Sequence, residues 1–297
     1  MNKIDVSIIT VIATEKEYPL IKDAIQSIYD KVEGLNYEII ISVNCNTVHH
    51  NVEKLKQDYP NFTILDTDGD TGFGNANNLG AKHATGKYLF MLNPDTILLN
   101  NAVKILFDFM ENNPKCGACG SNLYYEDHKP CPSYNPLPSI TTEIESVFNL
   151  DKKIIKRQFN NSDLPKKVGY VSGATTMMRR DFYEQLGGFD ADFYLYYEDC
   201  ELGYRIKKQG YDSMNVPSAK IIHLESQSTT SEYKRCCQIQ TKRTYFTKTY
   251  GKSYWLIVKS IRWIKILFSL FVFGILRKKD KFDYWRIEYK QMLKLNE

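Results

Sequence analysis

Tyr88-Leu89-Phe90-Met91-Leu92-Asn93-Pro94-Asp95 is an apolar run that ends in a short polar segment. The apolar run predicts a buried strand, and the proline behind it ends the ladder of strand hydrogen bonds and fixes the local backbone. Asp95 is therefore expected to project from the carboxyl edge of a sheet. The structural alternative is an aspartate that caps the next predicted helix, at residues 102–112.

Strands and helices alternate around this run through the first 120 residues. The predicted strands are residues 6–12, 37–43, 62–65 and 88–92, and the predicted helices are residues 19–28, 52–59, 76–85 and 102–112. This alternation forms βαβ units, so the predicted fold class is α/β with a mostly parallel central sheet flanked by helices. Ligands of such sheets bind beyond the carboxyl ends of the strands, where Asn44, Gly72 to Asn78 and Asn93 to Asp95 fall.

A glycine-rich turn, Asp68-Gly69-Asp70-Thr71-Gly72-Phe73-Gly74, leads into the third of these helices. Such turns let the backbone approach a ligand and direct N–H groups toward negative charge. Asn77 occupies the third glycine position of the dinucleotide-binding fingerprint, so the turn does not match that motif. A plain turn with an asparagine cap is the alternative.

Glu198 and Asp199 open another predicted helix, after an aromatic and turn-rich segment. Acidic residues in a first helical turn are common because they complement the helix dipole. The second interpretation is chemical: one acidic site takes a proton while Asp95 holds a cation, which suits transfer of a group from a diphosphate to a hydroxyl. His223, at the end of a predicted strand, is a candidate metal ligand.

Composition excludes several classes of protein. The net charge of +4 gives no argument for nucleic-acid binding. Residues 6–12 are too short for the core of a secretory signal and are better interpreted as a strand. Seven irregularly spaced cysteines indicate a reducing cytoplasm, and Cys116 and Cys119 are interpreted as small core residues instead of a zinc or redox pair.

Residues 251–297 carry eleven Lys and Arg against four Asp and Glu. Lys259, Arg262 and Lys265 are spaced for one face of a helix, and the opposite face holds Leu256, Ile257, Trp263, Ile264, Leu267, Phe268 and Phe271. A basic stripe beside an aromatic-rich apolar face is typical of an interfacial helix on an anionic membrane. The alternative is a helix that packs on the catalytic domain or on a dimer partner.

Taken together, the motifs resemble glycosyltransferase family 2, inverting enzymes of the GT-A fold, over about residues 4–250. The segments that carry the resemblance are Val6 to Val11, Gly72-Phe73-Gly74 with Asn77-Asn78 and Gly80, Asn93-Pro94-Asp95, Ser172-Gly173-Ala174, Gly187-Gly188-Phe189-Asp190, Glu198-Asp199 with Arg205, and Pro217 to His223. They are most similar to the bacterial rhamnosyltransferase-like branch, whose members build cell-surface polysaccharides.

The resemblance implies residue roles. Asp95 would bind a divalent cation, Mg²⁺ or Mn²⁺, and the donor diphosphate, with His223 as a further metal contact. Asp199 would be the catalytic base, with Glu198 beside it. The residues implied at the donor site are Thr10, Asn44, Gly72, Phe73, Asn77, Asn78, Asn93, Asp95, Gly173 and Arg243.

Three departures from the family pattern qualify this expectation. Asn93 replaces the first acid of the usual Asp-x-Asp, as in the rhamnosyltransferase-like branch, which weakens the expected metal site. Asn44 stands where the second strand of the family commonly ends in an aspartate that reads the nucleobase. Gln240 and Arg243 are followed by Thr244 instead of the tryptophan of processive synthases, which favours transfer of a single sugar.

The resulting expectation is an inverting transferase that moves one sugar, L-rhamnose from dTDP-rhamnose, to a hydroxyl of a glycan or a polyprenyl-diphosphate-linked acceptor. The alternatives are a UDP-hexose donor or a catalytically silent nucleotide-sugar-binding partner. A nucleotidylyltransferase is disfavoured, because it would need a glycine-rich loop at residues 13–19, and these residues hold no glycine. The expected catalytic domain is residues 1–250, with the nucleotide side at 1–120 and the acceptor side at 121–250. Residues 251–297 would form a basic amphipathic helical extension, and residues 255–279 within it would attach the protein to the inner face of a bacterial membrane.

Overall fold

The computed structural model describes residues 3–45, 54–55, 59, 62–147, 158–225 and 231–295. The chain divides into two compact units. The first, called here the α/β unit, comprises Met1–Leu137, Ile155–Tyr194 and Glu198–Ser228. The second, called the helical unit, comprises Pro138–Ile154, Leu195–Tyr197 and Thr229–Glu297. The helix predicted at residues 52–59 lies mostly outside the described residues.

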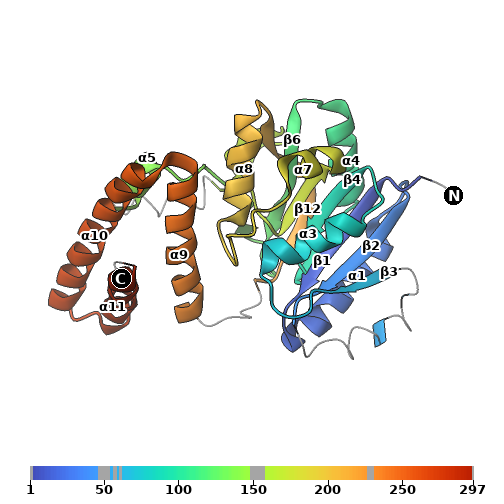
Figure 1. Cartoon of the computed structure of the whole chain (residues 1–297). Helices are drawn as coiled ribbons and strands as arrows, with labels where there is room; N and C mark the ends of the chain where they lie inside the picture. Colours follow the sequence, from blue (N-terminus) through green and yellow to red (C-terminus); the bar gives the residue numbers. More distant parts are fainter. Residues whose placement is uncertain are drawn as a thin grey trace. The chain divides into compact units, whose positions relative to one another are not determined.

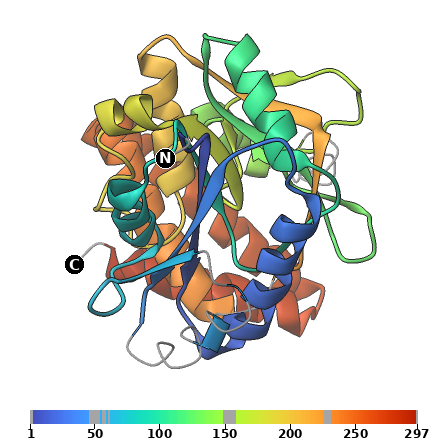
Figure 2. The ribbon, with the colours of Figure 1, turned by 90° about the vertical axis from the view of Figure 1, so that its right-hand side faces the viewer.

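The α/β unit is built on one sheet with the strand order β3-β2-β1-β4-β11-β6-β12-β5. Its first half consists of β1 (Val6–Ile12), β2 (Tyr37–Val43), β3 (Phe62–Asp66) and β4 (Tyr88–Leu92), which pair in parallel. β1 and β2, drawn in blue, run side by side in Figures 1 and 2. The predicted α/β class is confirmed, and β4 ends at Leu92, directly before Asn93.

The second half of the sheet mixes directions. β11 (Thr175–Arg179) is antiparallel to both β4 and β6 (Cys116–Tyr124), whereas β12 (Asp212–His223) is parallel to β6 and antiparallel to β5 (Thr96–Leu98). Four short strands complete the unit: β7 (Pro130–Cys131), β8 (Tyr134–Asn135), β9 (Lys166–Val168) and β10 (Tyr170–Val171). The last residue of β12 is His223, which pairs with Thr96 and so lies beside Asp95.

Two apolar layers cover the two faces of the sheet. Ile8 and Ile12 pack with α1 (Tyr18–Lys31), which follows a single 3₁₀ turn (Glu15–Glu17), and with α4 (Ala102–Asn112). Ile9 points to the other face, because side chains alternate along a strand. That face is covered by α3 (Phe73–His83), α7 (Arg180–Leu186) and α8 (Glu198–Lys208).

The helical unit contains α5 (Ile140–Val147), α9 (Ser231–Tyr250), α10 (Lys252–Ile275) and α11 (Lys279–Lys294), the last three coloured orange to red in Figure 1. Ile239 of α9, Ile266 of α10 and Met292 of α11 form its buried apolar cluster. Because Ile239 packs on the last two helices, α9 belongs to the same compact unit as they do. The unit boundary therefore lies before α9, at residue 229, and differs from the expected division at residue 250.

The faces of α10 correct one expectation. The basic stripe does not face solvent: Lys265 is buried, and Arg262 pairs with Glu288 of α11 and lies 3.9 Å from Glu143 of α5. Trp263 is partly buried against Tyr289. The exposed face is apolar, and more than half of each of these side chains is exposed: Leu256, Ile264, Leu267, Phe268, Phe271, Ile275 and Leu276, with Ile257 at 50%. Helical spacing predicts that a stripe exists but not which way it faces.

Among the described residues, no helix combines the length and the apolar character that a membrane span requires.

Candidate active site

Asp199 is held in the first turn of α8 by two backbone N–H groups. Its Oδ2 accepts a hydrogen bond from the Gly173 N–H at 3.2 Å, and its Oδ1 accepts one from the Cys200 N–H at 2.8 Å. A Cβ atom at Gly173 would lie 3.6 Å from both Asp199 Cβ and Phe73 Cε1. The structure therefore brings together three predicted site residues, Asp199, Gly173 and Phe73, from three separate segments.

The two adjacent carboxyl groups have different environments. Burial, and then the nearby charge of Asp199, raise the pKa of Glu198 to about 8. Burial also raises the pKa of Asp199, to about 6, although the N–H groups of Gly173 and Cys200 act to lower it. Two like charges this close are unfavourable, so near neutral pH the proton resides on Glu198 and the charge on Asp199. Asp199 is then the group able to accept a proton.

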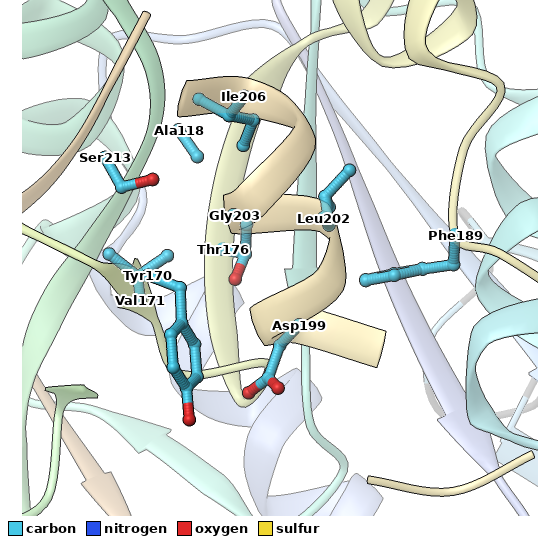
Figure 3. Close-up of a pocket in the computed structure, with 10 residues that line it drawn as sticks. All are labelled: Ala118, Tyr170, Val171, Thr176, Phe189, Asp199, Leu202, Gly203, Ile206 and Ser213. Carbon is cyan, nitrogen blue, oxygen red and sulfur yellow. The ribbon is translucent and has the colours of Figure 1, made fainter. Parts of the chain in front are cut away.

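A small cavity lies beside the buried Asp199. It has a volume of about 10 Å³, room for about one water molecule. The residues that line it are Ala118, Tyr170, Val171, Thr176, Phe189, Asp199, Leu202, Gly203, Ile206 and Ser213. In Figure 3 the Asp199 carboxylate and the Tyr170 hydroxyl point to the same side, away from Ala118 and Ile206. One side of the carboxylate is thus in apolar surroundings, which disfavour its charged form.

The turn Gly187-Gly188-Phe189 is fixed from two sides. Asn78 of α3 donates from Nδ2 to the Phe189 carbonyl at 2.8 Å and accepts from the Phe189 N–H at 2.9 Å. Arg205 of α8 donates to the carbonyls of Leu186 and Gly188 at 2.7 and 2.8 Å, and Glu201 holds its guanidinium. A Cβ atom at Gly188 would lie 2.4 Å from Asn78 Oδ1, so only glycine fits. Asn78 and Arg205 thus position the turn that places Phe189 beside Asp199.

The N-terminus of α3 differs from the expected open anion site. The Gly72 N–H donates to Asp70 Oδ1 at 3.1 Å, and the Phe73 N–H donates to the Tyr194 carbonyl at 3.0 Å. Gly72 has a φ of 88°, and a Cβ atom there would lie 2.4 Å from that carbonyl oxygen. The glycine is therefore required by contact with the protein's own backbone, and these two N–H groups already have partners.

Asn44 organises the loop before α3. Its Oδ1 accepts from the Thr71 N–H at 2.8 Å and from the Thr67 hydroxyl at 3.0 Å, and its Nδ2 donates to Asp70 at 3.0 Å. Asn77 donates to the Phe73 carbonyl within α3 at 3.0 Å. Both predicted donor residues are thus engaged in shaping this loop and helix.

Asp95 and His223 meet as predicted. Asp95 is 6% exposed, and its Oδ1 lies 3.4 Å from His223 Nε2. The Oδ1 atom of Asn93 is buried and has no hydrogen-bond partner in the part of the chain that the structure describes. Carboxylate and amide oxygens suit Mg²⁺ or Mn²⁺, and imidazole is a ligand of transition-metal ions, so the residues fit a divalent cation. A cation bound there would neutralise negative charge on a diphosphate.

Three nearby residues were missed by the sequence analysis. Ligand atoms of Cys131, His223 and Glu225 lie within 4.8 Å of one another. The buried Glu17 accepts from the N–H groups of Ala13 and Thr14, and burial, with a smaller effect from the charge of Asp95, raises its pKa. Cys131, Glu225 and Glu17 come from three different segments, so no single local motif could have identified all three.

The loop Ser172-Gly173-Ala174 joins the two acidic sites. The Asn93 N–H donates to the Ala174 carbonyl at 3.0 Å, and Gly173 holds Asp199.

Two further predicted donor residues, Thr10 and Arg243, lie elsewhere. Thr10 lies inside β1 between Ile8 and Ile12, and its hydroxyl is buried, with no partner among the described residues. Arg243 lies in the helical unit, where it contacts the Leu295 carbonyl at 3.5 Å.

Comparison with known proteins identifies the family of this chain. The family model for glycosyl transferase family 2 matches residues 7–187. The N-acetylglucosaminyl-diphospho-decaprenol L-rhamnosyltransferase of Mycobacterium tuberculosis is 29% identical over 206 residues, which are 64% of this chain and 67% of that protein. Rhamnosyltransferase WbbL of Escherichia coli is 24% identical over 231 residues, 72% of this chain and 84% of that protein.

A solved structure shares the fold. The mannosyltransferase of Pyrobaculum calidifontis, in complex with GDP-Man and Mn²⁺, matches with a TM-score of 0.61 at 14% identity. The match covers 99% of this chain and 85% of that one. It supports the GT-A architecture predicted from the sequence.

Proposed function

The chain belongs to glycosyltransferase family 2, and on that premise we propose that it transfers one sugar, with inversion, from a nucleotide-diphospho-sugar to a hydroxyl of an acceptor. The observation that carries the proposal is the pair Glu198 and Asp199, in which burial leaves one carboxyl protonated and the other charged. The charged one is held by backbone N–H groups in a fixed orientation.

Asp199 acts as the general base. An acceptor hydroxyl is a far weaker acid than water-exposed carboxyls, so its proton must leave as the new bond forms. The hydroxyl oxygen attacks the anomeric carbon, the bond from that carbon to the diphosphate oxygen breaks, and the proton goes to the Asp199 carboxylate. A single displacement of this kind inverts the anomeric centre.

Asp95 and His223 hold a divalent cation, with the unpartnered Oδ1 of Asn93 as a further oxygen at the end of β4. The chemistry that the cation supplies is neutralisation of the charge that develops on the departing diphosphate. Asn93 in place of an acid leaves the site with one carboxylate fewer, so we expect weaker metal affinity than that of an Asp-x-Asp site.

The donor is dTDP-rhamnose, in keeping with the two rhamnosyltransferases to which the chain is similar. A UDP-hexose is the second candidate, because the family's nucleobase-reading position is Asn44, whose side chain is engaged in its own loop. The acceptor is a sugar on a polyprenyl diphosphate, and the product enters a cell-surface polysaccharide. The mycobacterial relative carries such an acceptor in its name.

The acceptor's lipid places the protein at the cytoplasmic face of the membrane. The exposed apolar face of α10, called here the apolar face, is continuous with the exposed basic residues Arg277, Lys278, Lys279 and Lys281. Apolar side chains enter the boundary of headgroups and acyl chains, and basic ones pair with anionic lipids.

The direct test is donor turnover. The purified protein is incubated with dTDP-rhamnose, UDP-glucose or GDP-mannose and Mn²⁺, and released nucleoside diphosphate is measured with and without a lipid-linked acceptor. Thermal shifts with dTDP, UDP and GDP are recorded in parallel, since a bound ligand raises the melting temperature. We expect dTDP to give the largest shift. Binding without any turnover would favour a catalytically silent partner, and the absence of both would refute the proposal.

A further inference from the structure

The helical unit contains a cavity of its own, with a volume of about 220 Å³. It is lined by Tyr197, Arg235, Gln238, Ile239, Lys242, Arg262, Tyr284 and Glu288. All of these residues belong to the helical unit, and α9, α10 and α11 contribute all but Tyr197. The cavity is separate from the acidic residues already described, which lie in the α/β unit.

Cations outnumber carboxylates around this cavity. Lys242 pairs with Glu143 at 2.6 Å, and Arg262 pairs with Glu288, whereas Arg235 donates to the Tyr284 carbonyl at 2.6 Å. The buried Lys265 lies near Glu143 as well, and its Nζ is 5.5 Å from the centre of the Trp285 ring. Among the described residues, the three cations that line the cavity, Arg235, Lys242 and Arg262, are accompanied by the two carboxylates of Glu143 and Glu288, and buried charge is costly unless it is balanced. An anion in the cavity would balance it.

One acceptor in the cavity is also unused. Glu288 is 0% exposed, and its Oε2 has no hydrogen-bond partner among the residues that the structure describes. A buried carboxylate oxygen of this kind requires an O–H or N–H donor. The ligand that suits the cavity therefore carries both negative charge and hydroxyl donors. The Arg235 guanidinium lies over the Tyr284 ring, 3.2 Å from its centre, and this stacking orients it at the cavity.

Tyr197, which lines the cavity, belongs to a segment with unusual backbone. Tyr196 and Tyr197 have φ angles of 69° and 70°, in the left-handed region that bulky residues avoid. Unfavourable backbone of this kind persists where surrounding structure imposes it, and it gathers at functional sites.

We propose that the cavity binds the phosphate-bearing sugar of the acceptor, with Arg235, Lys242 and Arg262 on phosphate and Glu288 on a sugar hydroxyl. The inference rests on the proposed transferase function, which it extends by naming the part of the acceptor that is recognised. It places phosphate recognition for donor and acceptor on different units: Asp95 for the first and the helical cavity for the second.

Binding is measured by calorimetry on the full chain, with inorganic pyrophosphate and glucose 1-phosphate as probes, in EDTA so that no cation assists Asp95. Glucose 1-phosphate should bind, and Arg235→Gln should weaken it roughly tenfold or more, the loss typical of a hydrogen bond to a charged group. Arg235→Lys keeps the charge and should retain most of the affinity. Arg286→Gln, an exposed arginine on α11, is the matched control and should change nothing.

Titrations in the presence of a mixture of dTDP, UDP and GDP show whether the probes bind in the helical cavity or at the donor site, which the nucleotides occupy. If the probes bind in the helical cavity, saturation with these nucleotides leaves their affinity unchanged. Competition, equal affinity in Arg235→Gln and Arg286→Gln, or no binding to the native chain would each overturn the inference. Donor hydrolysis by the native chain is assayed separately, so that a failure of the proposed function is recognised independently of these titrations.

Discussion

The N–H of Gly173 lies 3.2 Å from the Oδ2 of Asp199 and connects the loop after β10 to the first turn of α8. The same loop accepts a hydrogen bond from Asn93, at the end of β4. A single tripeptide, Ser172-Gly173-Ala174, therefore sets the position of the proposed base relative to the strand end that carries Asp95.

Asp199→Asn should lower turnover by at least roughly 100-fold, because the amide cannot take the acceptor proton. Asparagine has nearly the same shape as aspartate, and its amide oxygen can still accept one of the two backbone hydrogen bonds. Folding and donor binding should therefore persist. Steady-state turnover and nucleotide thermal shifts are the measurements. Glu198→Gln is the matched control and should cost much less, since Glu198 is already protonated near neutral pH. Equal losses in both variants would refute the assignment of the base.

The pH dependence of turnover follows from the pKa of Asp199, which burial raises to about 6. A base must be deprotonated, so kcat/KM should rise with pH through about 6 and level off above it. In the Glu198→Gln variant, the rise of kcat/KM with pH should have the same midpoint, because Glu198 is protonated across the pH range of that rise. A limb centred near 4, the value of an ordinary aspartate, would contradict the buried environment of Asp199.

Asp95→Ala should weaken Mn²⁺ binding and reduce nucleoside-diphosphate affinity much more than nucleoside affinity, because the cation contacts phosphate only. His223→Ala should act in the same direction and less strongly. Calorimetry with Mn²⁺ alone gives a readout that does not depend on activity. Chelation should reproduce the effect of Asp95→Ala on the native chain. If nucleoside and nucleoside diphosphate lost affinity equally, Asp95 would have a structural role.

Asn78→Ala should destabilise the protein by about 1–3 kcal/mol, because it removes the hydrogen bonds of Asn78 to the Phe189 carbonyl, the Phe189 N–H and the Tyr183 hydroxyl in a buried turn. Chemical denaturation measures this change. The expected effect on nucleotide affinity is small, in contrast to the donor contact that the family resemblance implies. Asn75→Ala, on the exposed side of the same helix, provides the comparison. A large loss of nucleotide affinity at unchanged stability would restore Asn78 to the donor site.

Phe268→Ser combined with Phe271→Ser should abolish co-sedimentation with anionic liposomes. These side chains are 59% and 68% exposed, so their loss should leave the melting temperature almost unchanged. Leu164→Ser, which removes a 73% exposed side chain of the α/β unit, is the control. This design replaces truncation after Tyr250, which would remove Ile266 and Met292 from the apolar cluster. Unaltered sedimentation of the double variant would leave protein packing as the better role for the apolar face.

Local patterns predicted the strand ends well. Asp95 and His223 each follow from a strand boundary, and the sheet then places them side by side. The partners of Asn78, Arg205 and Cys131 could not be predicted in this way, because each contact depends on how distant segments meet in three dimensions. Asn78 is 111 residues from the turn it holds. Several motif residues, Asn44, Asn77 and Asn78 among them, make hydrogen bonds that shape the loop and turn around the site, and their roles toward the donor stay predictions.

The inward direction of Arg262 and Lys265 has a consequence for how ionic strength would affect membrane attachment. With these charges directed into the helical unit, the outer surface of α10 depends on apolar burial, and the exposed basic residues at 277–281 beside it respond to salt. Screening weakens exposed charge pairs over about 8 Å at physiological salt but hardly changes apolar transfer. Washing membranes with concentrated salt should therefore release little of the protein, whereas mild detergent should release most of it.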